Sequence, residues 1–179
     1  MFKILSGKEK LTGDVAFSDI LRSLIGGSFS ILSLLLLSKW TDHLYIMAPF
    51  GASCVLLYAA SQSPLAQPRN IIFGHFISAF VGLVFLKLFG ISMWSIAFSV
   101  GTAIALMQFL KAVHPPAGAN PLVILLTAEQ IQYGWDFLVF PVLLGSLILV
   151  SIAMVVNNFK TKHHWPLYGL GLIKTKSDE

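Results

Sequence analysis

Two short stretches of this sequence interrupt apolar runs with proline, glycine and small polar residues. One reads Pro49-Phe50-Gly51-Ala52-Ser53, and the other, preceded by His114-Pro115, reads Pro116-Ala117-Gly118-Ala119-Asn120. Proline cannot continue a preceding helix, but it suits the first turn of a new one, because its φ is helical and its missing N–H would be unpaired there anyway. Each stretch therefore predicts the start of a helix whose small residues let a ligand approach backbone amides.

These two starts could together bind an anion. The first turn of a helix carries unpaired N–H groups and roughly +0.5 of an elementary charge from the helix dipole. Two such turns facing one cavity would hold a small anion with several acceptor oxygens, without any charged side chain. We predict that the substrate is bound by small and polar residues of both stretches with one nearby arginine: Gly51, Ala52, Ser53, Arg69, His114, Gly118, Ala119 and Asn120. The alternative is that both stretches are kinks at tight helix crossings, because proline and glycine are common in membrane helices.

Two histidines and one arginine are further polar residues that could take part in function near these stretches. His75 and His114 are the candidates for carrying a coupled proton, because imidazole titrates near neutral pH and an ionisable group within a membrane is suspected of function. His75 could instead serve packing through a hydrogen bond. Arg69 either reaches the membrane surface or attracts an anion. No third metal ligand stands at suitable spacing, so we expect no metal site and no cofactor.

The composition assigns the chain to a membrane. Of its 179 residues, 56% are hydrophobic and 11% are charged, whereas soluble domains carry about 25% charged residues. The net charge of +4 comes mainly from the two ends and indicates orientation in a bilayer rather than nucleic-acid binding. Cys54 is the single cysteine, which excludes an intrachain disulfide. Residues 1–14 are polar and predict neither a signal peptide nor a transit peptide.

Six apolar segments predict an all-α, polytopic membrane bundle. They cover residues 20–38, 44–60, 71–89, 91–110, 116–128 and 137–156, and about 20 residues are needed to cross a bilayer. The fifth segment is short enough to end at the midplane, whereas the last is a clean span. The domain organisation is then a cytoplasmic N-terminal segment, 1–19, a transmembrane domain, 20–157, and a basic cytoplasmic tail, 158–179.

The distribution of Lys and Arg predicts the orientation. If the N-terminus is cytoplasmic and all six segments cross, ten of the 12 basic residues lie inside and only Lys39 and Lys87 lie outside, as the positive-inside rule requires. Three segments separate the two proline breaks, so the breaks enter from opposite faces, which is the pattern of an inverted repeat with two discontinuous half-helices. Small residues at helical spacing, such as Gly74, Ser78 and Gly82, predict close helix packing.

Several motifs together resemble one known family. His114-Pro115-Pro116-Ala117-Gly118-Ala119 is similar to the signature of the HPP family of integral membrane proteins, and residues 48–53, the loop 63–70 and Gly74-His75 also match that family's pattern. The resemblance covers roughly residues 20–156. Asn120 stands where a smaller residue such as Thr is expected.

The resemblance implies a function and a location. HPP members of cyanobacteria and chloroplasts are known as nitrite transporters, which implies nitrite uptake, in nitrate assimilation, by a multi-pass membrane protein. Because residues 1–14 predict no transit peptide, we expect this membrane to be the bacterial cell membrane. We expect the partners to be a small anion and the lipid bilayer, with no nucleic acid. We also expect a homo-oligomer, because six short segments barely surround a cavity.

Two other functions stay open. Gly51-Ala52-Ser53 at a helix start resembles the nucleophile segment of rhomboid proteases, which suggests an intramembrane serine hydrolase. An activated serine needs a base within hydrogen-bond reach, but in the predicted topology His114 enters from the opposite face and residues 137–156 contain no histidine. We therefore favour transport and do not expect an enzyme. The third possibility is a membrane assembly subunit that transports nothing.

Overall fold

The computed structural model describes residues 15–41, 43, 45–161 and 164–170. Within these residues the chain forms six α-helices, joined by short 3-10 and π turns, and no strand: α1 Phe17–Thr41, α2 Ala48–Ala59, α3 Pro68–Phe89, α4 Met93–Phe109, α5 Asn120–Thr127 and α6 Leu144–Asn158. The predicted all-α class is confirmed. The predictions for residues 1–14 and for the tail beyond residue 170 lie outside the described residues.

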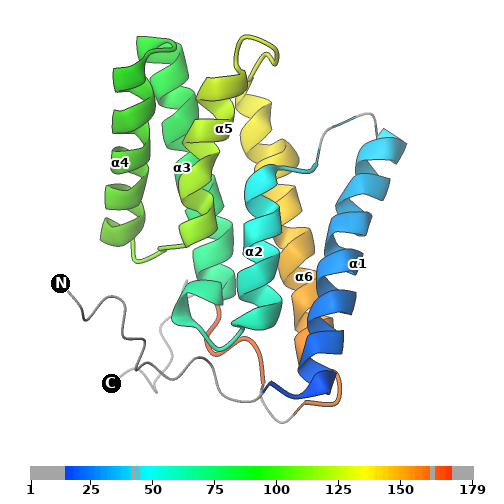
Figure 1. The fold of residues 1–179 in the computed structure, drawn as a ribbon. Coiled ribbons are helices and arrows are strands. Elements are labelled where there is room, and N and C mark those ends of the chain that lie inside the picture. The colour runs from blue at the N-terminus through cyan, green and yellow to red at the C-terminus, as the bar shows by residue number, and fades with distance from the viewer. Residues whose placement is uncertain (1–14, 42, 44, 162–163, 171–179) are drawn as a thin grey trace, which may run out of the picture.

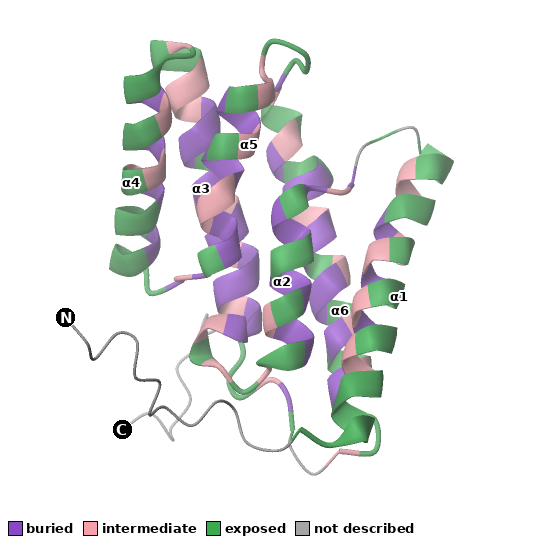
Figure 2. Cartoon of the chain, viewed as in Figure 1, coloured by how far each residue is buried: buried purple, intermediate pink, exposed green. Residues whose placement is uncertain are grey.

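The bundle has the helices of a transmembrane protein. Three apolar helical stretches are long enough to cross a bilayer, namely α1, α3 and the region Trp135–Asn158 that ends in α6, whereas α2 and α4 are apolar but shorter. The span in α3 is 50% buried and that in α1 only 17% buried. The central helix is therefore α3, while α1 and α4 expose most of their side chains at the two edges (Figure 2).

Both proline stretches start helices, as predicted. Ala48 and Pro49 open α2 behind an extended Met47. His114 is extended, with φ −132° and ψ 104°, because a residue before proline avoids the helical region. The predicted helix 116–128 is wrong in detail, since Pro115–Ala119 is a 3-10 turn and only Asn120–Thr127 is α-helical. Prolines supply no N–H, which leaves the 3-10 turn short of helical hydrogen bonds.

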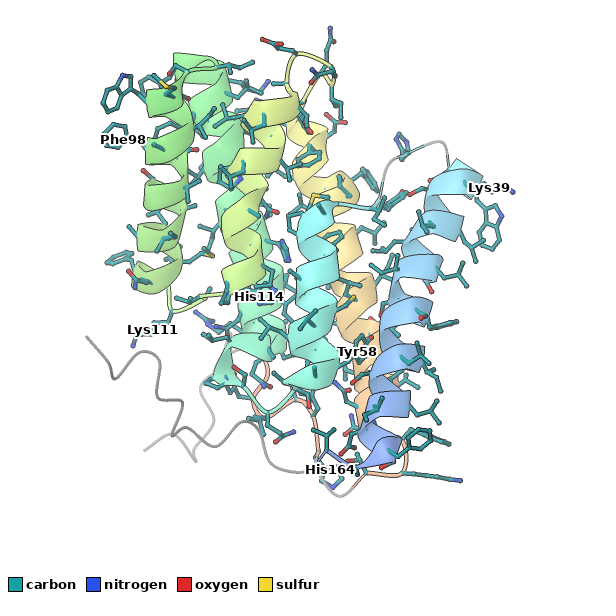
Figure 3. The ribbon with its side chains drawn as sticks, in the orientation of Figure 1. Lys39, Tyr58, Phe98, Lys111, His114 and His164 are labelled. Atoms are coloured by element: carbon teal, nitrogen blue, oxygen red, sulfur yellow. The ribbon has the colours of Figure 1, made fainter. Side chains whose placement is uncertain are left out.

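The two half-helices run in opposite directions from starts within the body of the bundle. Figure 1 shows α2 descending and α5 rising beside the longer α3, with the upper part of α2 level with the lower part of α5. The 3-10 turn Pro115–Ala119 packs against both α2 and α3. Lys39 lies at the upper end of α1, whereas Lys111 lies below α4 (Figure 3). This arrangement has the opposed half-helices that the inverted-repeat prediction requires.

The predicted last span, 137–156, is present within the apolar stretch Trp135–Asn158, but its first part is not α-helical. A 3-10 turn, Trp135–Leu138, leads into a π turn, Val139–Leu143, and α6 begins only at Leu144. Phe140 breaks the helical geometry with φ −124° and ψ 109°. Pro141 follows it, and a residue before proline is biased toward extended geometry.

The row of small residues on α3 explains the close approach of the second break. A Cβ built at Gly74 would lie 2.7 Å from Cβ of His114 and 2.9 Å from the Ala112 carbonyl oxygen, and one at Gly82 would lie 2.9 Å from Cδ1 of Ile124. Between them, the Ser78 hydroxyl donates to the Ala117 carbonyl. The prediction of close helix packing along this row is confirmed.

Part of the predicted tail packs on the bundle. In residues 164–170, which we call the C-terminal strap, Trp165 is buried and both of its backbone polar groups pair with the Asn158 side chain. The Leu167 amide donates to Gln67 Oε1 at 2.8 Å, and the Tyr168 hydroxyl lies 2.6 Å from the Pro64 carbonyl. The strap therefore covers the turn that precedes α3.

Candidate functional site

Ser53 is the centre of a buried polar cluster. Its position one turn into α2 brings its Oγ to 2.8 Å from Nε2 of His75, on α3, and to 2.8 Å from Nε2 of His114, at the second break. A third contact, at 3.2 Å, joins the hydroxyl to the Pro49 carbonyl of its own helix. Two histidines from different segments thus share one hydroxyl group.

The break before α5 orients His114. Its extended backbone, imposed by Pro115, lets the ring lie between the half-helices (Figure 3), and Gly74 leaves room for its Cβ. The Nδ1 atom lies 2.9 Å from the carbonyl oxygen of Leu65, in the turn before α3. Because a carbonyl can only accept, Nδ1 carries the hydrogen and Nε2 of the neutral ring is an acceptor.

Asn120 orients His75 from the first residue of α5. Its Nδ2 lies 3.0 Å from the His75 carbonyl oxygen and 3.2 Å from His75 Nδ1. The amide nitrogen faces a carbonyl, so it donates to both atoms, and His75 Nδ1 is an acceptor. The Phe50 ring packs against the imidazole with its centroid 5.0 Å away.

These bonds form a chain with one direction. The Asn120 amide donates to His75 Nδ1, His75 Nε2–H donates to Ser53 Oγ, the Ser53 hydroxyl donates to His114 Nε2, and His114 Nδ1–H donates to the Leu65 carbonyl. The four side chains are at most 1% exposed. We call Ser53, His75, His114 and Asn120 the midplane cluster.

The cluster can accept a proton at one histidine without losing a hydrogen bond. If His114 gains a proton, its Nε2–H donates to Ser53 Oγ, and the Ser53 hydroxyl can turn to the Pro49 carbonyl. Protonation of His75 at Nδ1 would instead oppose the hydrogens of Asn120 Nδ2. The two rings are also close, with centroids 5.1 Å apart, so two positive charges would repel each other strongly. The geometry therefore suits a single proton, held at His114.

The remaining predicted binding residues lie around the cluster rather than in it. Gly51 and Ala52 are exposed on α2, and Gly118 and Ala119 are half-buried. In both first turns a backbone amide already donates to a carbonyl of the same segment. The Phe50 amide donates to the Met47 carbonyl at 2.9 Å, and the Ala117 amide donates to the His114 carbonyl at 3.0 Å.

Arg69 caps the end of another helix. Its guanidinium donates to the carbonyls of Leu110 and Lys111, at the end of α4, and to that of Leu170 in the C-terminal strap. The last carbonyls of a helix lack partners within the helix, and a planar guanidinium offers five donors to such groups. The structure does not bring Arg69 into hydrogen bonding with the midplane cluster.

Metal ligands are sparse in the part of the chain that the structure describes. No group of three or more His, Cys, Asp and Glu side chains gathers there. The two cluster histidines both direct Nε2 at the Ser53 hydroxyl, so these nitrogens are already hydrogen-bonded.

The contact between Ser53 and His114 corrects one sequence inference. The predicted topology brings His114 in from the opposite face and keeps it away from Ser53, but α2 and α5 overlap side by side (Figure 1) and the two side chains meet. The sequence does not predict the hydrogen bond from His114 to the Leu65 carbonyl, because every residue has a backbone carbonyl and the residue type gives no indication of its partner. Gly74 and Phe50 belong to motifs noted in the sequence, but their contacts with His114 and His75 were not predicted.

Comparison with known proteins agrees with the motifs. Residues 12–166 match the family described as "HPP, transmembrane region". The chain belongs to the HPP family. This HPP chain is 42% identical over 127 residues to one transmembrane protein of Dictyostelium discoideum, covering 69% of the chain and 45% of that relative. A second transmembrane protein of the same organism is 36% identical over 177 residues, covering 93% of the chain and 56% of the relative. The HPP chain thus spans about half the length of these relatives. No solved structure matches it.

Proposed function

We propose that this HPP protein transports a small inorganic anion across the membrane, with nitrite as the favoured substrate and nitrate assimilation as the context. The observation that best supports this proposal is that His75 and His114, from separate segments, both hydrogen-bond to the Ser53 hydroxyl between two opposed half-helices. Opposed half-helices that begin near the midplane are the usual place for a transporter's substrate and coupling ions. A buried ionisable group at that depth is expensive and is kept for function.

The proposed transport is coupled to a proton. Inward movement of an anion against a negative interior costs ~2.3 kcal/mol per charge per 100 mV, so uptake needs a concentration gradient or a co-transported cation. His114 can take up a proton while all its partners stay paired, and His75 connects it to Asn120. We therefore assign the coupling proton to His114, with His75 in a positioning role.

The test is nitrite flux into proteoliposomes. Ser53→Ala and His114→Gln are expected to lower protein-dependent nitrite flux at least tenfold, and replacement of both histidines by Gln should remove the response to a pH gradient. Ser151→Ala is the matched control, because its hydroxyl is exposed and bonds only within α6. Equal flux in all variants would overturn the assignment of the cluster.

The first-turn amides have a separate test. An added Cβ at Gly51 or Gly118 would meet no atom within 4 Å, so leucine at either position is expected to fold. If an anion approaches these amides, Gly51→Leu and Gly118→Leu should block flux. Unchanged flux in both variants would remove the amides from the site and leave the midplane cluster as its core.

We further propose that the protein lies in the bacterial inner membrane with both termini in the cytoplasm, as a homo-oligomer. The proposal of a bacterial membrane rests on the family resemblance. The proposed orientation rests on the asymmetry of Lys and Arg, and oligomerisation on the small size of the bundle.

Serine hydrolysis is the second candidate, and the 2.8 Å contact between Ser53 Oγ and His114 Nε2 favours it. Leu65 orients the base as the third group of a triad would. Ser53 is, however, fully buried and also bonded to His75. A fluorophosphonate probe should leave Ser53 unlabelled if the protein is a transporter, and labelling that is lost in Ser53→Ala would support a hydrolase instead.

A further inference from the structure

The midplane cluster contains one polar atom whose hydrogen-bonding capacity is unused. Asn120 is 1% exposed, and its Oδ1 receives no hydrogen bond from any described residue. The side-chain amide cannot be flipped, because Nδ2 donates to the His75 carbonyl at 3.0 Å and an oxygen in that place would face another oxygen. The unused group is therefore an acceptor, and leaving a buried acceptor unpaired is unfavourable.

The rest of the cluster has no spare donor for an anion. The hydrogens on His75 Nε2, Ser53 Oγ and His114 Nδ1 are all donated within the chain of hydrogen bonds. Two ionisable side chains are connected to Asn120: His75 is bonded to it directly, and His114 is connected to His75 through Ser53. Arg69 is not connected to Asn120, because its guanidinium bonds to carbonyls at the end of α4. A bare anion at Asn120 would face an unpaired oxygen, whereas a molecule with an O–H group would satisfy it.

From this polarity we propose that the transported species binds Asn120 Oδ1 as a neutral acid, so that the substrates are anions of small weak oxyacids. Nitrite and formate form such acids, whereas nitrate and chloride are anions of strong acids. The inference rests on the proposed transport function and narrows its substrate class. An added Cβ at Gly118, two residues before Asn120, would meet no atom within 4 Å, so the 3-10 turn beside Asn120 is not closely packed at that point.

The proton balance is simple. The proton held on His114 Nε2 passes by way of the Ser53 hydroxyl, to which this nitrogen is hydrogen-bonded, to the arriving anion, so that one N–H bond breaks, one O–H bond of the acid forms and His114 becomes neutral. The acid then donates its O–H to Asn120, and it releases the proton to water on the far side. The moving species carries no net charge. A bare anion would respond to voltage at ~2.3 kcal/mol per 100 mV, which is roughly 40-fold in equilibrium accumulation.

The experiment compares matched substrates in wild-type proteoliposomes. Initial flux of nitrite, nitrate, formate and chloride is measured with a clamped membrane potential, and flux into empty liposomes is subtracted because weak acids also cross bare lipid. Nitrite and formate should pass at least tenfold faster than nitrate and chloride, acidify the lumen, and respond little to voltage.

Other outcomes separate the inference from the function on which it rests. If nitrate and chloride pass as fast as nitrite, the neutral-acid inference is wrong although anion transport stands. If none of the four anions shows protein-dependent flux, the transport proposal fails and the inference fails with it. Weak-acid flux that is strongly voltage-dependent would mean that the bare anion moves, which also overturns the inference.

Substitutions at Asn120 give an independent readout. Asn120→Leu removes the Oδ1 acceptor together with the hydrogen bonds that Nδ2 donates to His75. It should lower protein-dependent nitrite flux at least tenfold, with the fold checked by gel filtration and thermal melting. Asn157→Leu is the matched control, because Asn157 is buried and donates to the Leu57 carbonyl outside the cluster. If folded Asn120→Leu transports nitrite like the wild type, Asn120 is not the acceptor.

Discussion

Ser53 pairs two groups that would otherwise be unsatisfied. Without its hydroxyl, His114 Nε2 loses its donor and His75 Nε2–H loses its acceptor, both in a fully buried site. Leaving such groups unpaired costs about 1–3 kcal/mol each. Ser53→Ala should therefore lower the stability of the protein in detergent, measured as the free energy of unfolding, by at least about 1 kcal/mol. Ser151→Ala, on the exposed side of α6, should change it by less than about 0.5 kcal/mol, and equal effects would contradict the hydrogen-bond chain.

The two histidines differ in how they can accept a proton. His114 can be protonated with its partners intact, while Asn120 directs donor hydrogens at His75 Nδ1. On acidification His114 should therefore gain its second N–H before His75 does. Nitrogen-15 NMR of histidine-labelled protein would distinguish the rings, with His75→Gln and His114→Gln used to assign the signals. Protonation of His75 first would contradict the assignment of the coupling proton to His114.

At the scale of elements, Gly74 sets the distance between α3 and the second break. Its substitution by alanine would place a Cβ 2.7 Å from His114 Cβ and 2.9 Å from a backbone oxygen, so the segment must move. Overpacking of this kind costs about 1–3 kcal/mol, and the shift of His114 should also reduce nitrite flux. In Gly101→Ala the new Cβ meets no atom within 4 Å, and helix propensity predicts a neutral effect or a gain of up to about 1 kcal/mol. Thermal melting of both variants tests the difference.

The C-terminal strap should contribute measurable stability. Trp165 is 2% exposed, and truncating a buried tryptophan to alanine costs about 3–5 kcal/mol. Burial raises the pKa of the Tyr168 hydroxyl, against the opposing effect of Arg69, so the hydroxyl remains a donor at neutral pH. Trp165→Ala should lower the melting temperature clearly more than Tyr168→Phe, which removes only the hydroxyl. Similar melting of Trp165→Ala and the wild type would mean that the strap is dispensable.

Proline, glycine and hydropathy predicted the elements better than the contacts between them. Pro49 and Pro116 predicted two helix starts, and the small residues from Gly74 to Gly82 predicted the close packing of α3 against a neighbouring segment. The meeting of Ser53 and His114 escaped prediction, because it depends on the depth at which each half-helix starts rather than on its direction of entry. The break at Phe140 was missed although Pro141 signalled it. The strap has no helical period, so its docking depends on tertiary contacts alone.

At the scale of the whole molecule, the distribution of Lys and Arg predicts which end of the bundle faces the cytoplasm. Gln62, between α2 and α3, and Gln130, between α5 and α6, are exposed residues in turns at opposite ends of the bundle. With Cys54 replaced by alanine, Gln130→Cys should react with a membrane-impermeant maleimide in intact cells, and Gln62→Cys only after the cells are opened. The two positions are matched in residue type and exposure, so a difference reports the side of the membrane. The reverse pattern would place the basic end outside, against the positive-inside rule. The Leu65 carbonyl that bonds to His114 lies in the same turn region as Gln62. The side of the membrane assigned to Gln62 is therefore also the side nearest to this bond, and the reverse labelling pattern would reverse the proposed direction of transport.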